Sequence, residues 1–191
     1  MKYESMSIRK AVQMIDEKRL LLPHIQRPFV WKQDRTNNQV RRFMDSIMRG
    51  YPFSTLLFWK TRDDIQVRRF VEDYKDGMNI KDTYIKSSEL ADKEKTLVLD
   101  GQQRLQTLYT ALKGTYNGKE LYFDILSGKE VFQDGKDELK YDFDYLTREQ
   151  ATLKSNNESY WILLKGVVLS VETTTKIKKQ ILSKMRERMS V

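Results

Sequence analysis

The chain of 191 residues contains no cysteine and a single histidine, His24. Without cysteine there can be no disulfide bond, no thiolate nucleophile and no cysteine-based zinc site. A single histidine also excludes a multi-histidine metal centre and catalysis by a pair of histidines. These absences exclude most designs of nuclease and protease from this chain, including an HNH-type nuclease.

Long apolar runs are also missing. No stretch reaches the roughly 18 to 20 consecutive apolar residues that cross a membrane, and the N-terminus lacks the charged and then apolar layout of a signal peptide. A G-x-x-x-x-G-K-[ST] loop is absent as well, so any nucleotide site must be of another kind. Because the sequence has neither a membrane-spanning run nor a signal-peptide pattern, we expect a cytoplasmic protein without a membrane partner.

Hydrophobic residues make up 39% of the chain, which is enough to fill the core of one domain or of a compact two-lobed unit. The 35 basic and 27 acidic residues give a net charge of +8, which favours polyanions such as nucleic acid. Many soluble proteins carry an excess of lysine without this role, so a solvated surface is the alternative. The candidate DNA contacts are Arg41, Arg42, Arg49 and Lys60.

The elements expected along the chain indicate an α+β domain, or else an α/β one, with a small mixed sheet flanked by helices. Helices are predicted at 8–18 (capped by Ser7), at 36–49, from about 102 to Gly114, and at 173–189. Strands are predicted at 20–22, 54–59, 65–71, 96–99 and 120–126, the last with a hairpin partner at 130–133. Residues 60–95 are predicted to be mainly a long polar connection, 140–155 have a mixed pattern, and 160–169 are apolar.

The domain organisation follows from the last predicted helix. We expect one domain over 1–172, followed at 173–191 by a basic amphipathic helix. An amphipathic helix at a chain end needs a partner, so this helix is expected to begin a connection to a further C-terminal domain.

The best functional clue is the sequence Asp-Gly-Gln-Gln-Arg at 100–104, hereafter the DGQQR turn. It stands where the apolar run 96–99 stops and a helical pattern begins, so it is predicted to be a strand-to-helix turn. Free N–H groups at a helix start favour anions, and Gly101 lets a ligand approach the main chain. Arg104 adds a guanidinium that can grip phosphate oxygens.

The other side chains of the DGQQR turn can act on a bound ligand. Gln102 and Gln103 can orient a water molecule or contact a polar ligand edge, and Asp100 could hold a metal ion or activate water. In the alternative interpretation, Asp100 caps the helix, Gly101 makes the turn, and the Gln and Arg side chains form solvated surface.

A second candidate site lies at Gln26–Trp31, hereafter the QRPFVW segment. Gln26 and Arg27 could contact phosphate or a base, while Phe29 and Trp31 supply stacking surface. In the alternative interpretation the two aromatic rings are core anchors and Arg27 is an ion-pair partner.

Three blocks in order carry a resemblance to a known family: Gln26–Trp31, Asp45–Phe53 and Asp100–Leu108. Over most of residues 5 to 170 the chain resembles the N-terminal domain of GmrSD-type and SspE-type restriction proteins, which is related to the ParB/sulfiredoxin fold. The resemblance implies binding and hydrolysis of a nucleoside triphosphate at the DGQQR turn, and recognition of modified DNA in phage defence. Family members commonly carry a C-terminal nuclease domain with an HNH-like motif, for which this chain has no residues. The chain is therefore expected to be a fragment, a separately encoded subunit or a member that has lost cleavage.

By this resemblance Asp100, Gln102, Gln103 and Arg104 would be catalytic, and Gly101, Gln26 and Arg27 would bind the nucleotide. Gln26 and Arg27 would lie in the same cleft, either beside the nucleotide site or on the DNA-sensing side. Arg104 would neutralise phosphate charge, Asp100 would position Mg²⁺ or water, and the glutamines would orient the nucleophile. Hydrolysis would act as a switch that couples DNA contact to a nuclease domain or subunit, with a homo-oligomer as a possible assembly. The rivals are a non-catalytic module that seats DNA or a partner in the same anion pocket, and a scaffold with neither activity.

Overall fold

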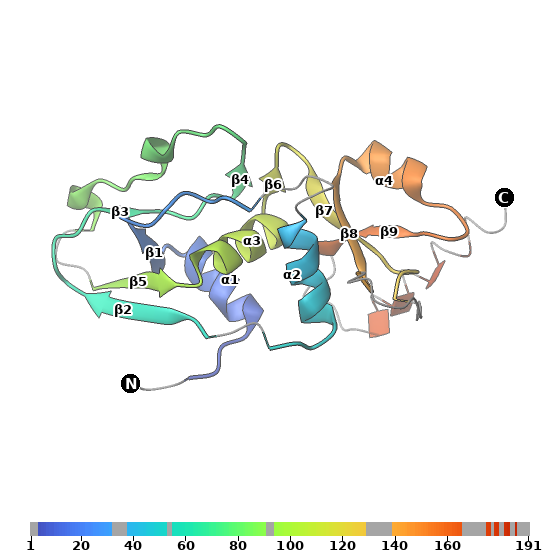
Figure 1. Ribbon diagram of the computed structural model, residues 1–191, viewed down its shortest axis with the longest axis horizontal. Helices are drawn as coiled ribbons and strands as arrows, with labels where there is room; N and C mark the ends of the chain where they lie inside the picture. The colour runs from blue at the N-terminus through green and yellow to red at the C-terminus, as the bar shows by residue number, and fades with distance from the viewer. Residues whose placement is uncertain are drawn as a thin grey trace.

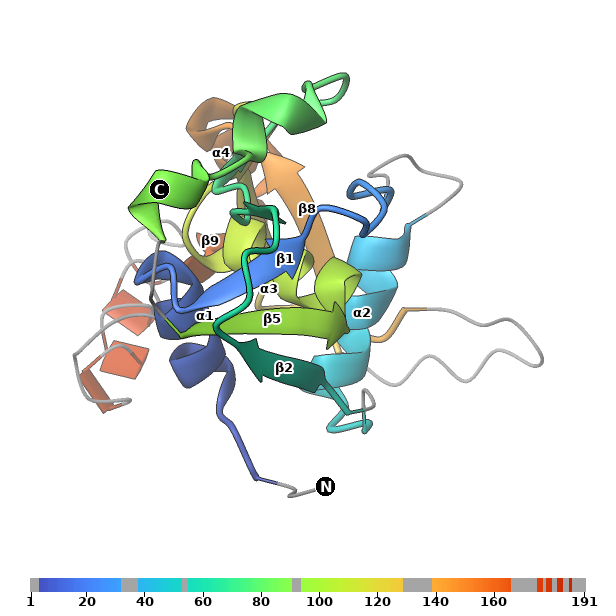
Figure 2. The same cartoon turned by 90° about the vertical axis from the view of Figure 1, so that its left-hand side faces the viewer.

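Two parallel strands, β1 (Leu20–Pro23) and β5 (Lys95–Asp100), form the centre of a four-stranded mixed sheet. β2 (Leu57–Thr61) pairs with β5, and β3 (Val67–Arg68) pairs with β1, both in antiparallel fashion. Figure 2 shows β2, β5 and β1 side by side. The computed structural model describes residues 4–31, 38–52, 55–90, 94–128 and 139–165, with 175–176, 178–179, 182–183 and 186.

Alternating side chains of the central strands supply two hydrophobic clusters. Leu20, Leu22 and Val98 join the main core with residues of α1 (Ile8–Asp16), α2 (Gln39–Met48) and α3 (Gln102–Leu112). Successive residues of a strand point to opposite faces, so Leu21 and Leu97 lie in a second, smaller cluster. The sheet is therefore buried on both faces over its central strands.

A second, antiparallel sheet has the strand order β8-β7-β9, from β7 (Glu120–Asp124), β8 (Asp142–Leu146) and β9 (Trp161–Leu163). Figure 1 shows this sheet and α4 (Arg148–Lys154) at the opposite end of the molecule from β2 and β5. A parallel pair, β4 (Asp73–Tyr74) and β6 (Thr115–Tyr116), completes the strands of the described residues. The fold is α+β, as predicted.

Several predicted elements are confirmed. Ser7 caps α1 by accepting a hydrogen bond from the backbone N–H of Lys10 at 3.2 Å. The predicted strands at 20–22, 96–99 and 120–126 correspond to β1, β5 and β7, and the helices at 36–49 and 102–113 to α2 and α3. The described residues between 175 and 186 are helical. None of the described helices is long and apolar enough to span a membrane.

Other predictions need correction. The strand expected at 54–59 begins at Leu57 and continues to Thr61, and the strand expected at 65–71 is reduced to β3. The connection 60–95 also contains β4 and two 3₁₀ helices, η1 (Ile80–Thr83) and η2 (Ser87–Glu89). The segment with a mixed pattern contains β8 and α4, and β8 and β9 are the partners of β7. The hairpin partner expected at 130–133 lies outside the described residues.

Candidate functional site

The parallel pairing of β1 and β5 brings the two sequence motifs together. Leu20 pairs with Thr96 and Leu21 with Leu97, so the carboxyl ends of both strands meet at one edge of the sheet. The QRPFVW segment follows β1, and the DGQQR turn includes the end of β5. Both motifs line one cavity of about 290 Å³, whose lining residues are Gln26, Arg27, Trp31 and Leu99 to Arg104.

Gly101 makes the strand-to-helix turn possible. It is the N-cap residue of α3 and has a φ of +93°, a left-handed conformation that side-chain-bearing residues rarely adopt. A Cβ at this position would lie 2.2 Å from Cδ2 of Leu56. The interpretation of Asp100 as the helix cap is therefore wrong, because Asp100 is the last residue of β5. The first turn of α3, at the positive end of the helix dipole, borders the cavity.

Arg104 and Asp100 form an ion pair across the turn, with Nη2 of the arginine 3.0 Å from Oδ2 of the aspartate. The arginine side chain is 16% exposed and the aspartate side chain is 66% exposed. The pairing therefore holds the guanidinium at the cavity wall, while the carboxylate remains open to solvent.

The two glutamines of the DGQQR turn are buried, so the interpretation of these side chains as solvated surface is wrong. Gln103 donates from Nε2 to the carbonyl oxygen of Pro28 at 3.0 Å, and its Oε1 accepts from the N–H of Val30 at 3.0 Å. Gln102 donates from Nε2 to the carbonyl oxygen of Arg27 at 2.5 Å, and its Oε1 is buried with no hydrogen-bond partner in the described part of the chain. Both side chains thus connect the QRPFVW segment to α3 by hydrogen bonds.

A buried arginine that the sequence did not single out lies behind the QRPFVW segment. Arg68 of β3 donates from Nη2 to the carbonyl oxygen of Gln26 at 2.6 Å, and among the described residues it forms no ion pair with a carboxylate. Burial lowers the pKa of its guanidinium. Gln26 in turn donates from Nε2 to the carbonyl oxygen of Leu99 at 2.9 Å. No local sequence pattern distinguishes this arginine from the exposed ones in the same polar connection.

The aromatic residues of the QRPFVW segment pack on the core, in agreement with the alternative interpretation of their role. Phe29 meets Tyr74 edge to face with ring centroids 5.0 Å apart. Trp31 meets Phe43 in the same manner at 5.4 Å, and it also lines the cavity. Of the two rings, only that of Trp31 is placed where it could contact a ligand.

The four predicted DNA contacts lie away from the cavity lining. Arg41 pairs with Asp142, and Nε of Arg49 lies 2.9 Å from Oδ2 of the buried Asp45. The ammonium group of Lys60 lies 4.0 Å from Glu94, and Arg42 is exposed on α2. Three of the four are thus close to carboxylates of the protein, and their role in binding DNA stays a prediction.

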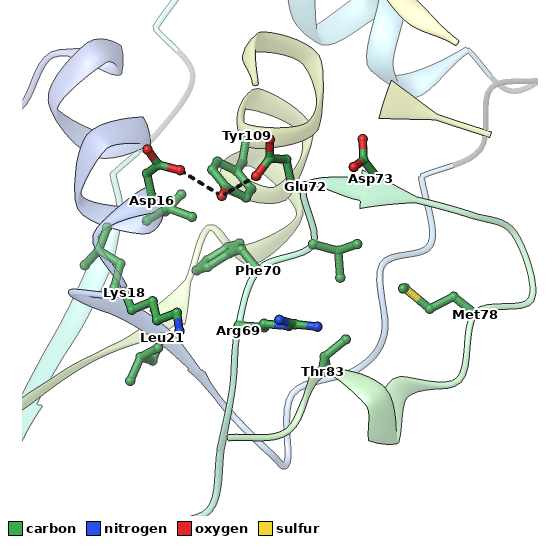
Figure 3. A pocket seen from close by; sticks show the side chains of 13 residues that line it. Asp16, Lys18, Leu21, Arg69, Phe70, Glu72, Asp73, Met78, Thr83 and Tyr109 are labelled. Carbon is green, nitrogen blue, oxygen red and sulfur yellow. Dashed lines mark hydrogen bonds between the residues drawn. The ribbon is translucent and has the colours of Figure 1, made fainter. Parts of the chain in front are cut away.

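A second cavity, of about 380 Å³, contains neither motif and lies between α1, α3 and the segment after β3. Figure 3 shows Asp16 and Glu72 on either side of the Tyr109 hydroxyl group, which lies 3.2 Å and 3.4 Å from their carboxylate oxygens. Burial and then the two carboxylates raise the pKa of Tyr109 well above its ordinary value, so the hydroxyl stays protonated at neutral pH. Through its hydrogen bond to Asp16, the hydroxyl group of Tyr109 links α3 to α1.

Two comparisons with known proteins bear on this site. The family model described as GmrSD restriction endonuclease, N-terminal domain, matches residues 8–188. The matched range contains the DGQQR turn, the QRPFVW segment and the intervening block at 45–53. A search of curated proteins returned no match.

Proposed function

Because the chain belongs to the family of GmrSD restriction endonuclease N-terminal domains, and so is a component of a restriction system, we propose that it binds and hydrolyses a nucleoside triphosphate to regulate restriction. The observation that carries this proposal is the single cavity shared by the DGQQR turn and the QRPFVW segment. Arg27, Arg104 and the first turn of α3 all border it. Guanidinium groups and a helix N-terminus in one recess suit phosphate oxygens.

The size of the cavity also supports a phosphate site. Its volume of about 290 Å³ is just below the range for small-molecule pockets, about 300 to 1,000 Å³. It suits the triphosphate group better than a whole nucleotide. In this arrangement Arg104 neutralises phosphate charge and Gly101 allows the phosphate to approach the main chain.

Mg²⁺ is the expected companion of the triphosphate. The described residues contain no group of three His, Cys, Asp or Glu side chains that could hold a metal by themselves. One open carboxylate nevertheless fits this ion, because Mg²⁺ with nucleotides takes one or two carboxylates and fills its other positions with phosphate and water. Asp100 would hold it, since only Oδ2 of this carboxylate is paired with Arg104. When bound, Mg²⁺ would offset the negative charge of the phosphates.

The contacts of Gln102 and Gln103 suggest how binding or hydrolysis of the nucleotide could affect other parts of a restriction system. The same side chains that border the cavity hold the backbone of the QRPFVW segment. A change at the phosphate site would therefore shift this segment, which we propose to lie on the DNA-sensing side. Turnover of the nucleotide would then regulate a nuclease domain or subunit. The sensed partner would be DNA, either modified or unmodified. We also propose that the protein assembles as a homo-oligomer.

One observation favours a second candidate, a non-catalytic module that seats a backbone phosphate of DNA, or a partner, in the same cavity. The amide nitrogen of Gln103 donates to Pro28 and its amide oxygen accepts from Val30, so this side chain has less capacity to orient a nucleophile. Gln102 retains an acceptor, because its buried Oε1 has no hydrogen-bond partner among the residues that the structure describes. Catalysis would then rest on Gln102, Arg104 and Asp100.

The test is release of phosphate from ATP, GTP, CTP and UTP with Mg²⁺, with and without modified DNA. Arg104→Ala should abolish release while the circular dichroism spectrum and the melting temperature remain near those of the wild type. Arg19→Ala is the matched control, because it removes a guanidinium from an exposed ion pair with Glu17 outside the cavity. Loss of DNA binding in Arg104→Ala, with no phosphate release by the wild type, would favour the non-catalytic module.

A further inference from the structure

An exposed apolar surface adjoins the cavity on the face of the sheet that carries the second hydrophobic cluster. Leu57, Trp59 and Leu99 are 39%, 41% and 37% exposed, respectively. Large apolar side chains exposed together beside a recess commonly mark a binding surface. We propose that these three residues, hereafter the apolar shelf, bind the nucleobase of the ligand whose phosphates occupy the cavity; this inference rests on the proposed function.

Strand geometry places the three residues on one face. Trp59 of β2 pairs directly with Leu97 of β5, and directly opposed residues share a face of the sheet. Leu99 follows two positions after Leu97 and therefore points the same way. Leu57 precedes Trp59 by two positions and so keeps its face of β2. The register of β2 and β5 shifts between Leu57 and Phe58, which places Leu57 opposite Asp100 at the start of the DGQQR turn. The apolar shelf thus begins at the cavity and extends along β2.

The shelf is continuous with the cavity because Leu99 belongs to both. With the triphosphate group in this small cavity of about 290 Å³, the nucleoside would lie beside it. At this edge the neighbouring surface on β2 and β5 is the apolar shelf. An indole ring and two leucine side chains would provide apolar contacts for a base, while the charged phosphates would lie beside Arg104.

The chemistry predicts an aromatic ligand with limited discrimination among bases. Stacking on a tryptophan ring does not depend on the hydrogen-bonding edge of the base, since every base has a π-face. The proposed substrate class is therefore a nucleoside triphosphate rather than an inorganic polyphosphate, and base selectivity must come from groups other than the shelf.

Isothermal titration calorimetry tests the proposal with two kinds of probe: the non-hydrolysable imido analogues of the four ribonucleoside triphosphates, and inorganic tripolyphosphate. The full chain should bind at least one analogue more tightly than tripolyphosphate. Trp59→Ala should weaken binding of that analogue by about fivefold to tenfold and leave tripolyphosphate binding unchanged, whereas Trp59→Phe should retain most of the affinity. Leu153→Ala, which truncates a highly exposed leucine of α4, is the matched control and should change neither affinity.

The outcomes separate this inference from the proposed function. If Trp59→Ala leaves analogue binding unchanged, or weakens the binding of both probes equally, the proposed binding of the base by the apolar shelf is refuted. The proposed phosphate site would not be affected by this result. If the wild type binds the analogues no more tightly than tripolyphosphate, the shelf is likewise overturned. Binding of neither probe by the wild type contradicts the proposed nucleotide site and the shelf together.

Discussion

The side-chain amide of Gln103 donates to the carbonyl oxygen of Pro28 at 3.0 Å, across 75 positions of the sequence. This bond joins the DGQQR turn directly to the QRPFVW segment. The oxygen of the same amide accepts from the N–H of Val30, so one side chain replaces the backbone pairing that this segment lacks. The shape of the candidate site therefore depends on a side chain whose first role is to hold another loop.

Replacing Gln103 by alanine should lower the free energy of unfolding by about 1 to 2 kcal/mol, because two partly buried hydrogen bonds that hold the QRPFVW segment are lost. Urea denaturation measures this change. Gln13→Ala is the matched control, since Gln13 is exposed on α1 and should cost less than about 0.5 kcal/mol. Equal losses in the two variants would show that Gln103 does not hold the segment.

Gly101→Ala should be more destabilising than Gly118→Ala. Both residues have a positive φ, +93° and +75°, so both variants carry a backbone cost of about 1 to 2 kcal/mol. Only at Gly101 would the new Cβ also meet a neighbour, Cδ2 of Leu56 at 2.2 Å, whereas nothing lies within 4 Å at Gly118. The Leu56 side chain can move to make room, so we expect an additional loss of up to about 1 kcal/mol, measured by thermal or chemical unfolding. Identical melting temperatures for the two variants would contradict the close packing of the turn.

Loss of the hydroxyl proton of Tyr109 should make the protein less stable in strong alkali. Burial, and then the neighbouring Glu72 and Asp16, raise the pKa of its hydroxyl group in the folded state above the ordinary value of 10.0. The unfolded chain thus releases this proton at a lower pH than the folded chain. The corresponding stability is fully present below about pH 10 and is lost as the pH rises further.

In alkali, the free energy of unfolding should fall less steeply with pH in Tyr109→Phe than in the wild type, by up to about 1.4 kcal/mol per pH unit. At pH 7 the variant should be less stable by about 1 kcal/mol, because the hydrogen bonds of the hydroxyl group are lost. The measurement is the free energy of unfolding from pH 7 to pH 11.5 in both proteins. Parallel curves for the wild type and the variant would rule out this contribution of Tyr109.

Asp45 joins α2 to the second sheet. Its buried carboxylate accepts from the N–H of Tyr141 at 2.7 Å and lies 2.9 Å from Arg49. Asp45→Ala should therefore lower the free energy of unfolding by about 2 to 3 kcal/mol in chemical denaturation. Asp144→Ala, which removes a partly exposed pair with Lys154, should cost at most about 1 kcal/mol. A smaller loss at Asp45 than at Asp144 would contradict a structural role for the buried carboxylate.

Elements with strong local signals were predicted well from the sequence. α1 has Ser7 as its cap and Ala11, Val12 and Ile15 on its buried face, all within one short segment. The DGQQR turn was located because an apolar run, a glycine and a helical period follow one another directly. In contrast, β3 and β4 have two residues each, which is too short for any period to be detected.

The chemistry of the candidate site was less accessible from the sequence. Asp100 was placed correctly at the start of the turn, but the burial of both glutamines was not anticipated. Polar side chains are predicted to be exposed unless partners can be named, and the partners here are backbone groups of a distant segment. Arg68 was missed for the same reason, since its partner is the carbonyl oxygen of Gln26.

The sequence by itself determined the strand-to-helix turn at 100–104, the α+β class, and the absence of cysteine and histidine-pair chemistry. Composition and local periodicity are sufficient for these, because capping, turn geometry and side-chain chemistry act over a few residues. Only the tertiary structure decided that the DGQQR turn and the QRPFVW segment share a cavity. That proximity depends on the parallel pairing of β1 with β5, whose register arises from long-range burial of Leu21 and Leu97 and has no local signature.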